Sequence, residues 1–305
     1  MKKVVLNEFS ARELKQKFEA HEIDSAITTF GSCESHGWHL PLGPDLFVPE
    51  EIAKRAALRL GKTIVVPGVP FGTSIHYNQF PMSVTLRFET TIAIAEDIFE
   101  SLINNGIKHI IILNGHDGNI PALEIAARKV KDRHKDAVLV FIPAWWNITG
   151  ARLKGTFDVW DGLGHGGEGE TSITMAVKPE LVNLEYAKSQ VPHDVIGFGE
   201  FSTIIWDIKE VTETGATGDS TKASLEKGQK MLDCVTDYVV EIVEKLEKME
   251  IPENIDYEKI QGLSNIAISG LMYGNPATIG QASRISGVTY NDIALLIAVI
   301  KENHK

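Results

Sequence analysis

The sequence lacks a disulfide framework, a membrane-spanning segment and an excess of basic charge. Its two cysteines, Cys33 and Cys234, are too few for a disulfide-stabilised secreted domain and favour a reducing compartment. Its longest uninterrupted apolar run is the eight residues 293–300, whereas a membrane-spanning helix needs about 20. Lysine and arginine number 30 against 41 aspartates and glutamates, and the net charge of -11 disfavours nucleic acids and anionic lipids. We therefore expect a cytoplasmic protein that binds neither nucleic acid nor membrane.

Short runs rich in valine and isoleucine alternate with segments whose apolar residues lie three and four apart, the spacing of amphipathic helices. The runs are continuously apolar, which is typical of parallel strands buried on both faces. The sequence therefore predicts an α/β fold, a three-layer α/β/α sandwich with a mostly parallel sheet. The expected strands are 26–30, 63–66, 109–113 and 138–142, and the expected helices are 49–60, 91–104 and 121–132.

The last quarter of the chain differs from the rest. A long amphipathic helix is expected at 222–249, and Pro252 marks a break after it. We therefore expect a core domain at 1–250 and a helical C-terminal extension at 251–305. The extension loosely resembles a helix-turn-helix, but its four Lys/Arg against five Asp/Glu disfavour DNA binding. We expect a helical arm that packs on the core or on a neighbouring subunit.

Clusters of histidine and carboxylate side chains follow the expected strands. After the first strand come Glu34 and His36, which lie two residues apart in an extended segment and so project together. The turn that follows is rich in proline and glycine and can bring Asp45 back to meet them. His116 follows the third strand. Because loops at the carboxyl ends of parallel strands converge, we expect these four side chains to share one site.

A third cluster lies in the glycine-rich segment 164–172 and holds His165, Glu168 and Glu170. A mixed set of histidines and carboxylates suits zinc, manganese or iron better than calcium, which prefers oxygen ligands. Five or six such ligands would hold two ions. Two ions about 3.5 to 4 Å apart can generate a hydroxide and polarise a carbonyl. The sequence therefore predicts hydrolysis of an amide without a covalent intermediate.

Each cluster also has a non-functional interpretation. Carboxylates in loops commonly cap turns and helices. The segment 162–167 also matches the dinucleotide pattern GxGxxG, but the strand before it is weak and the acidic helix start after it would repel a pyrophosphate. Single histidines are more often surface or core residues, which is our expectation for His21, His76, His109, His134 and His193.

Together, the three clusters resemble the motifs of the creatininase family of metal-dependent amidohydrolases. The matching segments are ESHGWHLPLGPD at 34–45, NGHDGN at 114–119 and HGGEGETS at 165–172, in the order of the family. The resemblance covers about residues 20–250. It implies a parallel sheet between helices, two divalent metal ions per subunit and a hexamer built as a trimer of dimers. Zn²⁺ is the first choice of metal, with Mn²⁺ or Fe²⁺ as alternatives at one site.

The resemblance also assigns roles to individual residues. It implies that Glu34, Asp45 and His116 hold the first metal, and that Asp45 bridges to a second metal held by His36. His165 matches the histidine that shuttles a proton to the leaving nitrogen.

One further ligand is needed for the second metal. Creatininase supplies a glutamate at the position where this chain has Gly118. Family members with glycine there carry a glutamate inside the third motif, which here is Glu168. We therefore expect Glu168 to be the replacement ligand and to take part in catalysis, and Glu170 to orient a ligand or the helix start at Thr171.

Two tryptophans close the substrate pocket of creatininase, and Trp146 and Trp160 are similar in placement. We expect these two residues and Asp117 to bind substrate. The expected substrate is a small amide, either cyclic and creatinine-like or a formamide. Two alternatives remain open: a peptidase that trims a small peptide precursor, and a non-catalytic binding protein whose extension recognises a partner.

Overall fold

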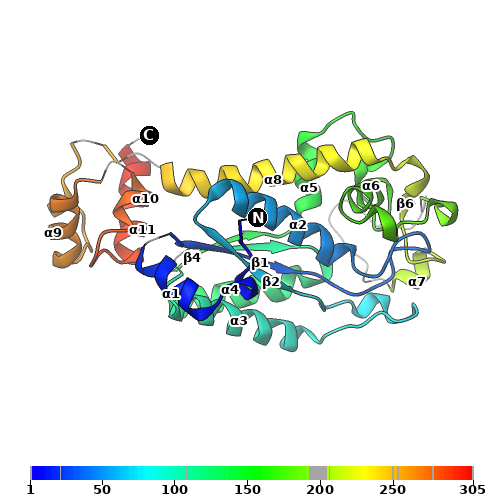
Figure 1. Cartoon of the computed structure of the whole chain (residues 1–305), viewed down its shortest axis with the longest axis horizontal. Helices are drawn as coiled ribbons and strands as arrows, with labels where there is room; N and C mark the ends of the chain where they lie inside the picture. Colours follow the sequence, from blue (N-terminus) through cyan, green and yellow to red (C-terminus); the bar gives the residue numbers. More distant parts are fainter. Residues whose placement is uncertain are drawn as a thin grey trace.

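A four-stranded parallel sheet forms the centre of the protein, with the strand order β2-β1-β3-β4 (Figure 1). The strands are β1 (Ser25–Phe30), β2 (Thr63–Val69), β3 (His109–Asn114) and β4 (Val138–Ile142). This computed structural model describes residues 2–20, 22–107, 109–135, 137–191, 205, 207–248, 251–252, 254–276 and 278–303. His21 and His193 lie outside these residues.

Both faces of the sheet are buried because successive residues of a strand point to opposite sides. Ile111 and Leu113 of β3 pack into one apolar cluster with residues of α2 (Pro44–Leu60) and α8 (Leu225–Lys248). Ile110 and Ile112 pack into a second cluster with residues of α3 (Phe88–Asn104) and α4 (Ile120–Arg133). The predicted three-layer α/β sandwich is confirmed, and the continuous apolar run of β3 is explained by the two layers of helices.

Helix α2 begins earlier than the sequence predicts. Pro44 occupies its first turn, where a missing N–H costs little, and Asp45 follows directly. Pro49 lies inside the same helix. A proline normally marks a helix start, which is why the prediction placed the first residue at 49. The earlier start carries Asp45 on a rigid element rather than on a loop.

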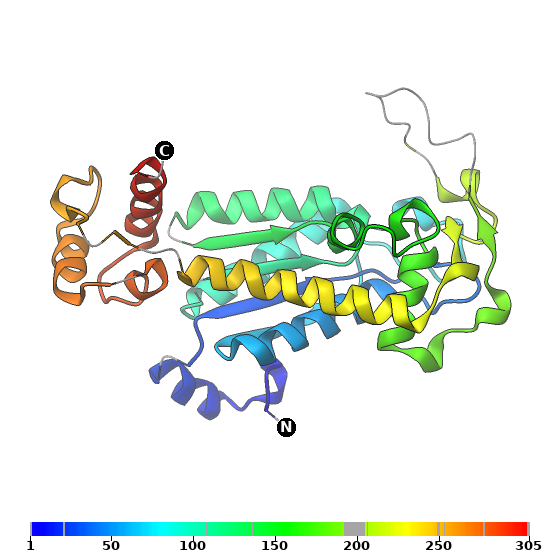
Figure 2. The same ribbon diagram turned by 90° about the horizontal axis from the view of Figure 1, so that it is seen from above.

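Smaller elements gather at the carboxyl end of the sheet, where the arrowheads of the strands point (Figures 1 and 2). They are α5 (Trp145–Arg152), α6 (Glu168–Val177), α7 (Ile208–Val211) and the two-stranded antiparallel sheet of β5 (Ser189–Gln190) with β6 (Gly218–Asp219). Helix α1 (Ala11–Glu19) lies elsewhere, near the beginning of β1 (Figure 1). Nothing in the described ranges is a helix both long and apolar enough to span a membrane.

The C-terminal extension lies at the opposite end of the molecule (Figure 2). It contains α9 (Asn265–Gly274), α10 (Ile279–Ala282) and α11 (Tyr290–Asn303), which share an apolar cluster of their own. The extension also packs on the core of the same chain at the amino ends of the strands. Arg284 forms an ion pair of 3.2 Å with Asp24, and the ring centroids of Tyr290 and His109 are 5.8 Å apart. Val138, the first residue of β4, packs against the cluster.

Candidate active site

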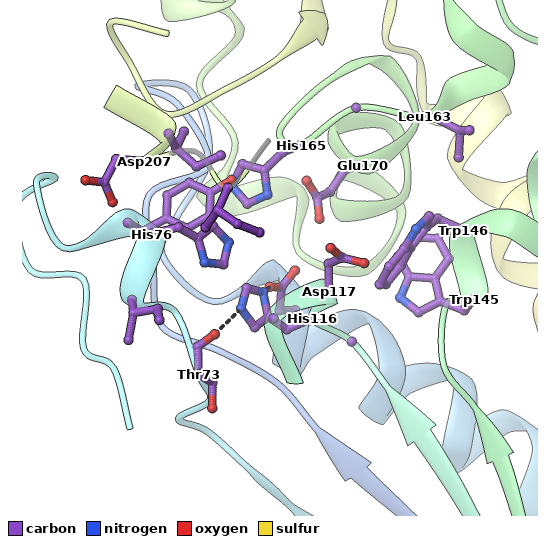
Figure 3. Close-up of a pocket in the computed structure, with 18 of the residues that line it drawn as sticks. Thr73, His76, His116, Asp117, Trp145, Trp146, Leu163, His165, Glu170 and Asp207 are labelled. Atoms are coloured by element: carbon purple, nitrogen blue, oxygen red, sulfur yellow. Dashed lines mark hydrogen bonds and ion pairs between the residues drawn. The ribbon is translucent and has the colours of Figure 1, made fainter. Parts of the chain in front are cut away.

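Six of the expected site residues converge at the carboxyl ends of β1 and β3. They form three groups, and within each group one ligand atom per residue lies within 4.8 Å of the others. Figure 3 shows His116, His165 and Glu170 directed into the same cavity. The side chains come from the loop after β1 (Glu34 and His36), the first turn of α2 (Asp45), the loop after β3 (His116), the loop before α6 (His165) and the first turn of α6 (Glu170).

Asp45 belongs to two of these groups. One of its carboxylate oxygens lies 3.0 Å from Nδ1 of His116, which is also 3.2 Å from Glu34. Its other oxygen lies 3.0 Å from Nε2 of His36, which is also 3.5 Å from Glu170. A carboxylate that presents one oxygen to each of two such groups has the geometry of a bridging ligand.

Backbone carbonyls orient both histidines. His36 donates from Nδ1 to its neighbour Glu34 O over 3.0 Å, and His116 donates from Nε2 to Thr73 O over 3.0 Å (Figure 3). A carbonyl only accepts, so the proton of each neutral ring sits on that nitrogen. The other nitrogen of each ring then presents a lone pair to the carboxylates, as in histidine ligands of metal sites.

The electrostatics of the group fit cations. Burial lowers the pKa of His36, but the carboxylates of Glu170 and Asp45 raise it well above its ordinary value. His116 behaves in the same way beside Glu34 and Asp45, so its pKa is also raised well above its ordinary value. Both carboxylate oxygens of Glu34 are buried without a hydrogen bond. Such an orphaned buried carboxylate is expensive unless a positive charge lies beside it, so the donor set suits divalent metal ions.

Two asparagines of the second motif hold the surrounding loops together. Asn119 accepts a hydrogen bond of 2.8 Å from the backbone N–H of Thr73 and donates one of 3.0 Å to Gly31 O. Asn114 accepts from the N–H of His116 over 3.2 Å and donates to Pro143 O over 2.9 Å. These bonds connect the loops after all four strands of the central sheet and fix the backbone that carries His116.

Gly118 has no room for the glutamate that creatininase carries there. An added Cβ would lie 2.1 Å from Thr73 O and 2.6 Å from Nε2 of His116, the two atoms that share a hydrogen bond. Any side chain at this position would therefore displace the loop that orients His116. The second motif therefore contributes no carboxylate at this position.

The carboxylate of Glu168, which the sequence predicts as the replacement ligand, is directed toward other partners. The Glu168 side chain is fully buried, but it accepts hydrogen bonds from the backbone N–H groups of Asp158 and Val159 over 2.9 to 3.1 Å. It also forms an ion pair with Lys227 of α8. Its carboxylate is not a member of any of the three groups of potential ligands formed by the described residues.

Glu170, rather than Glu168, belongs to one of the three groups of potential ligands. Both residues lie in the first turn of α6, and residues two apart on a helix point about 200° away from each other. Only one of them can therefore face the site. Glu170 lies 3.5 Å from His36 and also accepts a hydrogen bond from the N–H of Gly166.

His165 lies beside this group. Its ring centroid is 4.1 Å from that of His36, and its Nε2 donates to Ser35 O over 2.7 Å. Burial and the neighbouring His36 lower its pKa. The close approach depends on Gly166 (φ +57°), because a Cβ there would lie 2.5 Å from His36 O. The imidazole of His165 is thus neutral near pH 7 and can accept a proton.

A cavity of about 770 Å³ opens next to these side chains. Asp117 and Trp146 line it, together with Trp145, Phe88 and others. Figure 3 shows Asp117 near His116 and both tryptophans on another side. Trp160 is not among the lining residues. It lies in a 3₁₀ turn with φ +49° and is 40% exposed, so the spacing that suggested a pocket residue did not anticipate this turn.

Three lining residues were missed by sequence reasoning: His76, Tyr77 and Trp145. His76 stacks on His116 with ring centroids 5.7 Å apart and an angle of 7°. Burial and the carboxylates, Glu34 first among them, raise the pKa of Tyr77 well above its ordinary value, so its phenol stays protonated. The available signal was the position of His76 and Tyr77 in the loop after β2, and of Trp145 directly after β4, because such loops converge on the site.

The C-terminal extension has relatives of a different kind from those of the core. The family described as the C-terminal helical bundle of the tRNA modifying enzyme MnmG/GidA matches residues 239–305. The tRNA uridine 5-carboxymethylaminomethyl modification enzyme MnmG 1 of Fusobacterium nucleatum is 59% identical over 59 residues, which are 19% of this chain and 9% of that enzyme. The similarity is therefore confined to one module of a much longer protein.

The core is similar to hydrolases along nearly its whole length. The creatinine amidohydrolase of Pseudomonas putida is 26% identical over 250 residues, 77% of this chain and 94% of that protein. The mycofactocin precursor peptide peptidase of Mycobacterium tuberculosis is 25% identical over 224 residues, 70% of this chain and 82% of that protein. The crystal structure of a creatinine amidohydrolase superposes with a TM-score of 0.71 at 24% identity, covering 80% of this chain and 98% of that one. The family described as creatinine amidohydrolase matches residues 7–243, and the chain therefore belongs to the creatininase family of hydrolases.

Proposed function

We propose that this protein is a binuclear-metal amidohydrolase that cleaves the C–N bond of a small amide, either cyclic or a formamide. The observation that carries the proposal is the position of Asp45. Its two oxygens lie 3.0 Å from His36 and 3.0 Å from His116, each within a separate group of potential ligands. One carboxylate can thus serve two cations, as two-metal hydrolysis requires.

The ligand set of the proposal follows from the three groups. Glu34, Asp45 and His116 would hold the first metal, and His36, Asp45 and Glu170 the second. We propose Zn²⁺ as the first choice, with Mn²⁺ or Fe²⁺ possible at one site. Solved creatininases described as a manganese form and as a Zn–Zn type support this choice, at 25% and 24% identity and TM-scores of 0.69.

The bound cations would supply a water of lowered pKa and polarise the substrate carbonyl. The residues of this chain do the rest. His165 holds its Nε2 proton against Ser35 O, and its Nδ1 makes no hydrogen bond to a described residue. Nδ1 can therefore take up a proton and pass it to the leaving nitrogen. Asp117 and Trp146 line the cavity in which the substrate would lie.

A second candidate substrate is a short peptide. A cavity of about 770 Å³ is larger than a single small ring requires. The similarity to a peptide peptidase favours the same reading. Under this alternative, the site would trim residues from one end of a peptide precursor with the same ligands and the same proton donor.

The extension is proposed to be a docking module for a protein partner, separate from the catalytic domain at 1–250. Its similarity to the bundle of a tRNA-modifying enzyme supports a function that does not depend on the hydrolase site. Its charge of four Lys/Arg against five Asp/Glu favours protein over RNA. Gel-shift titration of the full chain with tRNA checks this choice, and tight binding that is lost in a chain ending at residue 250 would contradict it.

We further propose a cytoplasmic homohexamer, as the resemblance to creatininase implies. Sedimentation velocity of the purified chain tests the assembly, and a monomer would contradict it. Cell fractionation tests the location.

One experiment tests the proposed function directly. The full chain is produced in medium supplemented with zinc and manganese, and its metal content is measured. Two divalent ions per chain are expected. The metal-loaded protein is then screened against creatinine, other cyclic amides, formamides and short peptides, with a chelator-treated sample as the control. Absence of bound metal after supplemented growth would refute the proposal.

A further inference from the structure

Tyr77 lies in the cavity wall next to the proposed proton donor, and the reaction outlined above does not use it. Its ring centroid is 4.5 Å from that of His165 and 6.0 Å from that of Phe80. The residue is only 2% exposed and yet lines the cavity. Its hydroxyl makes no hydrogen bond to any residue that the structure describes, and it is not among the fully buried polar atoms that lack a partner, so it is open to the cavity. A buried tyrosine usually has a partner for its hydroxyl, so this group requires an explanation.

The backbone around Tyr77 is fixed by the same loop that orients a proposed metal ligand. Thr73 O and Ser74 Oγ both contact Nε2 of His116, at 3.0 and 3.3 Å. The N–H of Tyr77 donates to Ser74 O over 2.9 Å, and Tyr77 O accepts from the N–H of Phe80 over 2.9 Å. Tyr77 therefore cannot move independently of His116. A donor held in this way costs no reorganisation during a reaction.

The surroundings of Tyr77 are rich in acceptors that it does not use. Glu34, Asp45 and Glu170 belong to the ligand groups, and each has its own partner or a proposed cation. The phenol is thus left as a neutral donor beside the reacting centre. The Tyr77 hydroxyl therefore has no acceptor within the described protein, and the substrate can bring one.

We propose that Tyr77 is a further catalytic residue, whose O–H donates a hydrogen bond to the substrate carbonyl oxygen as negative charge develops on it. This inference rests on the proposed amide hydrolysis. No bond to Tyr77 forms or breaks, and its proton stays on the phenol. Removing one such donor from an acyl-transfer site typically costs about 100-fold or more in rate.

The test distinguishes the contribution of the Tyr77 hydroxyl from that of its ring. Tyr77→Phe keeps the ring against His165 and removes only the donor, whereas Tyr77→Leu removes both. The full zinc-loaded chain is titrated with acetohydroxamate, a metal-binding mimic of an amide, and binding is measured by calorimetry. We expect Tyr77→Phe to weaken hydroxamate binding about tenfold while zinc content stays unchanged. Tyr186→Phe, at a position 54% exposed, is the matched control and should bind as the wild type does.

Activity provides a second measurement once a substrate responds in the screen. Tyr77→Phe should lower kcat about 100-fold and leave KM within about threefold, because the bond strengthens only as the charge develops. Unchanged hydroxamate binding in Tyr77→Phe, with weakening only in Tyr77→Leu, would show a packing role and overturn the assignment. A wild-type chain that binds no zinc would overturn the proposed function and this assignment together.

Discussion

The two ends of the central sheet are packed in opposite ways. At the carboxyl ends, charged groups lie against one another, and Glu34, His36, Asp45 and His116 are each no more than 3% exposed. At the amino ends, the extension packs apolar side chains, with Leu296 and others fully buried. Burying charges costs stability and burying apolar area provides it. One end is therefore organised for chemistry at the expense of stability, and the other for stability alone.

The two regions also have separate apolar clusters and separate relatives. They meet where α10 packs against α8 and where Arg284 pairs with Asp24, an ion pair that is partly exposed. Exposed ion pairs contribute little to stability, about 0 to 1 kcal/mol. A substitution in the extension should therefore leave metal binding unchanged, and a substitution at the carboxyl end should leave the stability of the extension unchanged.

The largest effect on stability is expected in the extension. Leu296→Ala removes a fully buried side chain from its cluster and should cost about 2 to 5 kcal/mol in the free energy of unfolding of that module. Zinc affinity should not change, since the side chain lies at the other end of the sheet. Hydrogen exchange of α9 and α11 measures the first expectation and a zinc titration the second. A loss of zinc affinity would show that the two ends of the sheet are not independent.

The corresponding substitution at the carboxyl end should change the affinity for metal rather than the stability of the extension. Asp45→Asn keeps the shape of the proposed bridging ligand and removes its charge, so affinity for both zinc ions should fall roughly 100-fold or more. The hydrogen exchange of the extension should be unaffected. Titration against a chromophoric chelator gives the affinities. Retention of both ions at full affinity would exclude Asp45 as a bridge.

Much of the fold could be predicted from the sequence because burial on two faces leaves a clear pattern. The run Ile110 to Leu113 is apolar throughout, and each of its side chains contacts one of two helical layers. The choice between Glu168 and Glu170 could not be predicted. It depends on the residue at which α6 begins, and shifting that start by one residue turns every side chain by about 100°.

Trp160 and Tyr77 illustrate a second limit of prediction from sequence. Trp160 was placed by its distance along the chain from His165, but a 3₁₀ turn with positive φ intervenes and leaves it 40% exposed. Tyr77 reaches the site because the loop after β2 is held to β3 by Asn119. Neither the turn nor this hydrogen bond produces a periodic pattern in the sequence.

A moderate effect on stability is expected for Glu168→Gln. The structure gives this carboxylate a supporting role, since it pairs with Lys227 and holds the backbone of Asp158 and Val159. Loss of the buried charge should cost about 2 to 3 kcal/mol in the free energy of unfolding. Lys230→Met, one turn away on α8 and paired with Glu226 on the surface, should cost less than about 0.5 kcal/mol. Urea denaturation of both variants checks the difference.

The smallest expected effect is a pH dependence of stability that arises from the histidines at the carboxyl end. In metal-free protein the pKa values of His36 and His116 are raised by carboxylates, so their contribution to stability is complete below about pH 6.5, the unfolded value. It is lost as the pH rises through the raised folded pKa values. The unfolding temperature of metal-free protein should therefore fall between about pH 6 and pH 9.

Zinc should reverse this trend, because it binds the deprotonated imidazoles in place of the protons. Thermal unfolding with and without zinc at both pH values measures the difference. A metal-free unfolding temperature that rises over this interval would contradict the arrangement of charges.

We propose that Glu170, and not Glu168, completes a second metal site around Asp45. The most direct measurement is the zinc content of the wild type, Glu170→Gln and Glu168→Gln after equilibration with the same free zinc concentration. We expect two zinc ions per chain for the wild type and for Glu168→Gln, and one for Glu170→Gln. One ion in Glu168→Gln together with two in Glu170→Gln would contradict it.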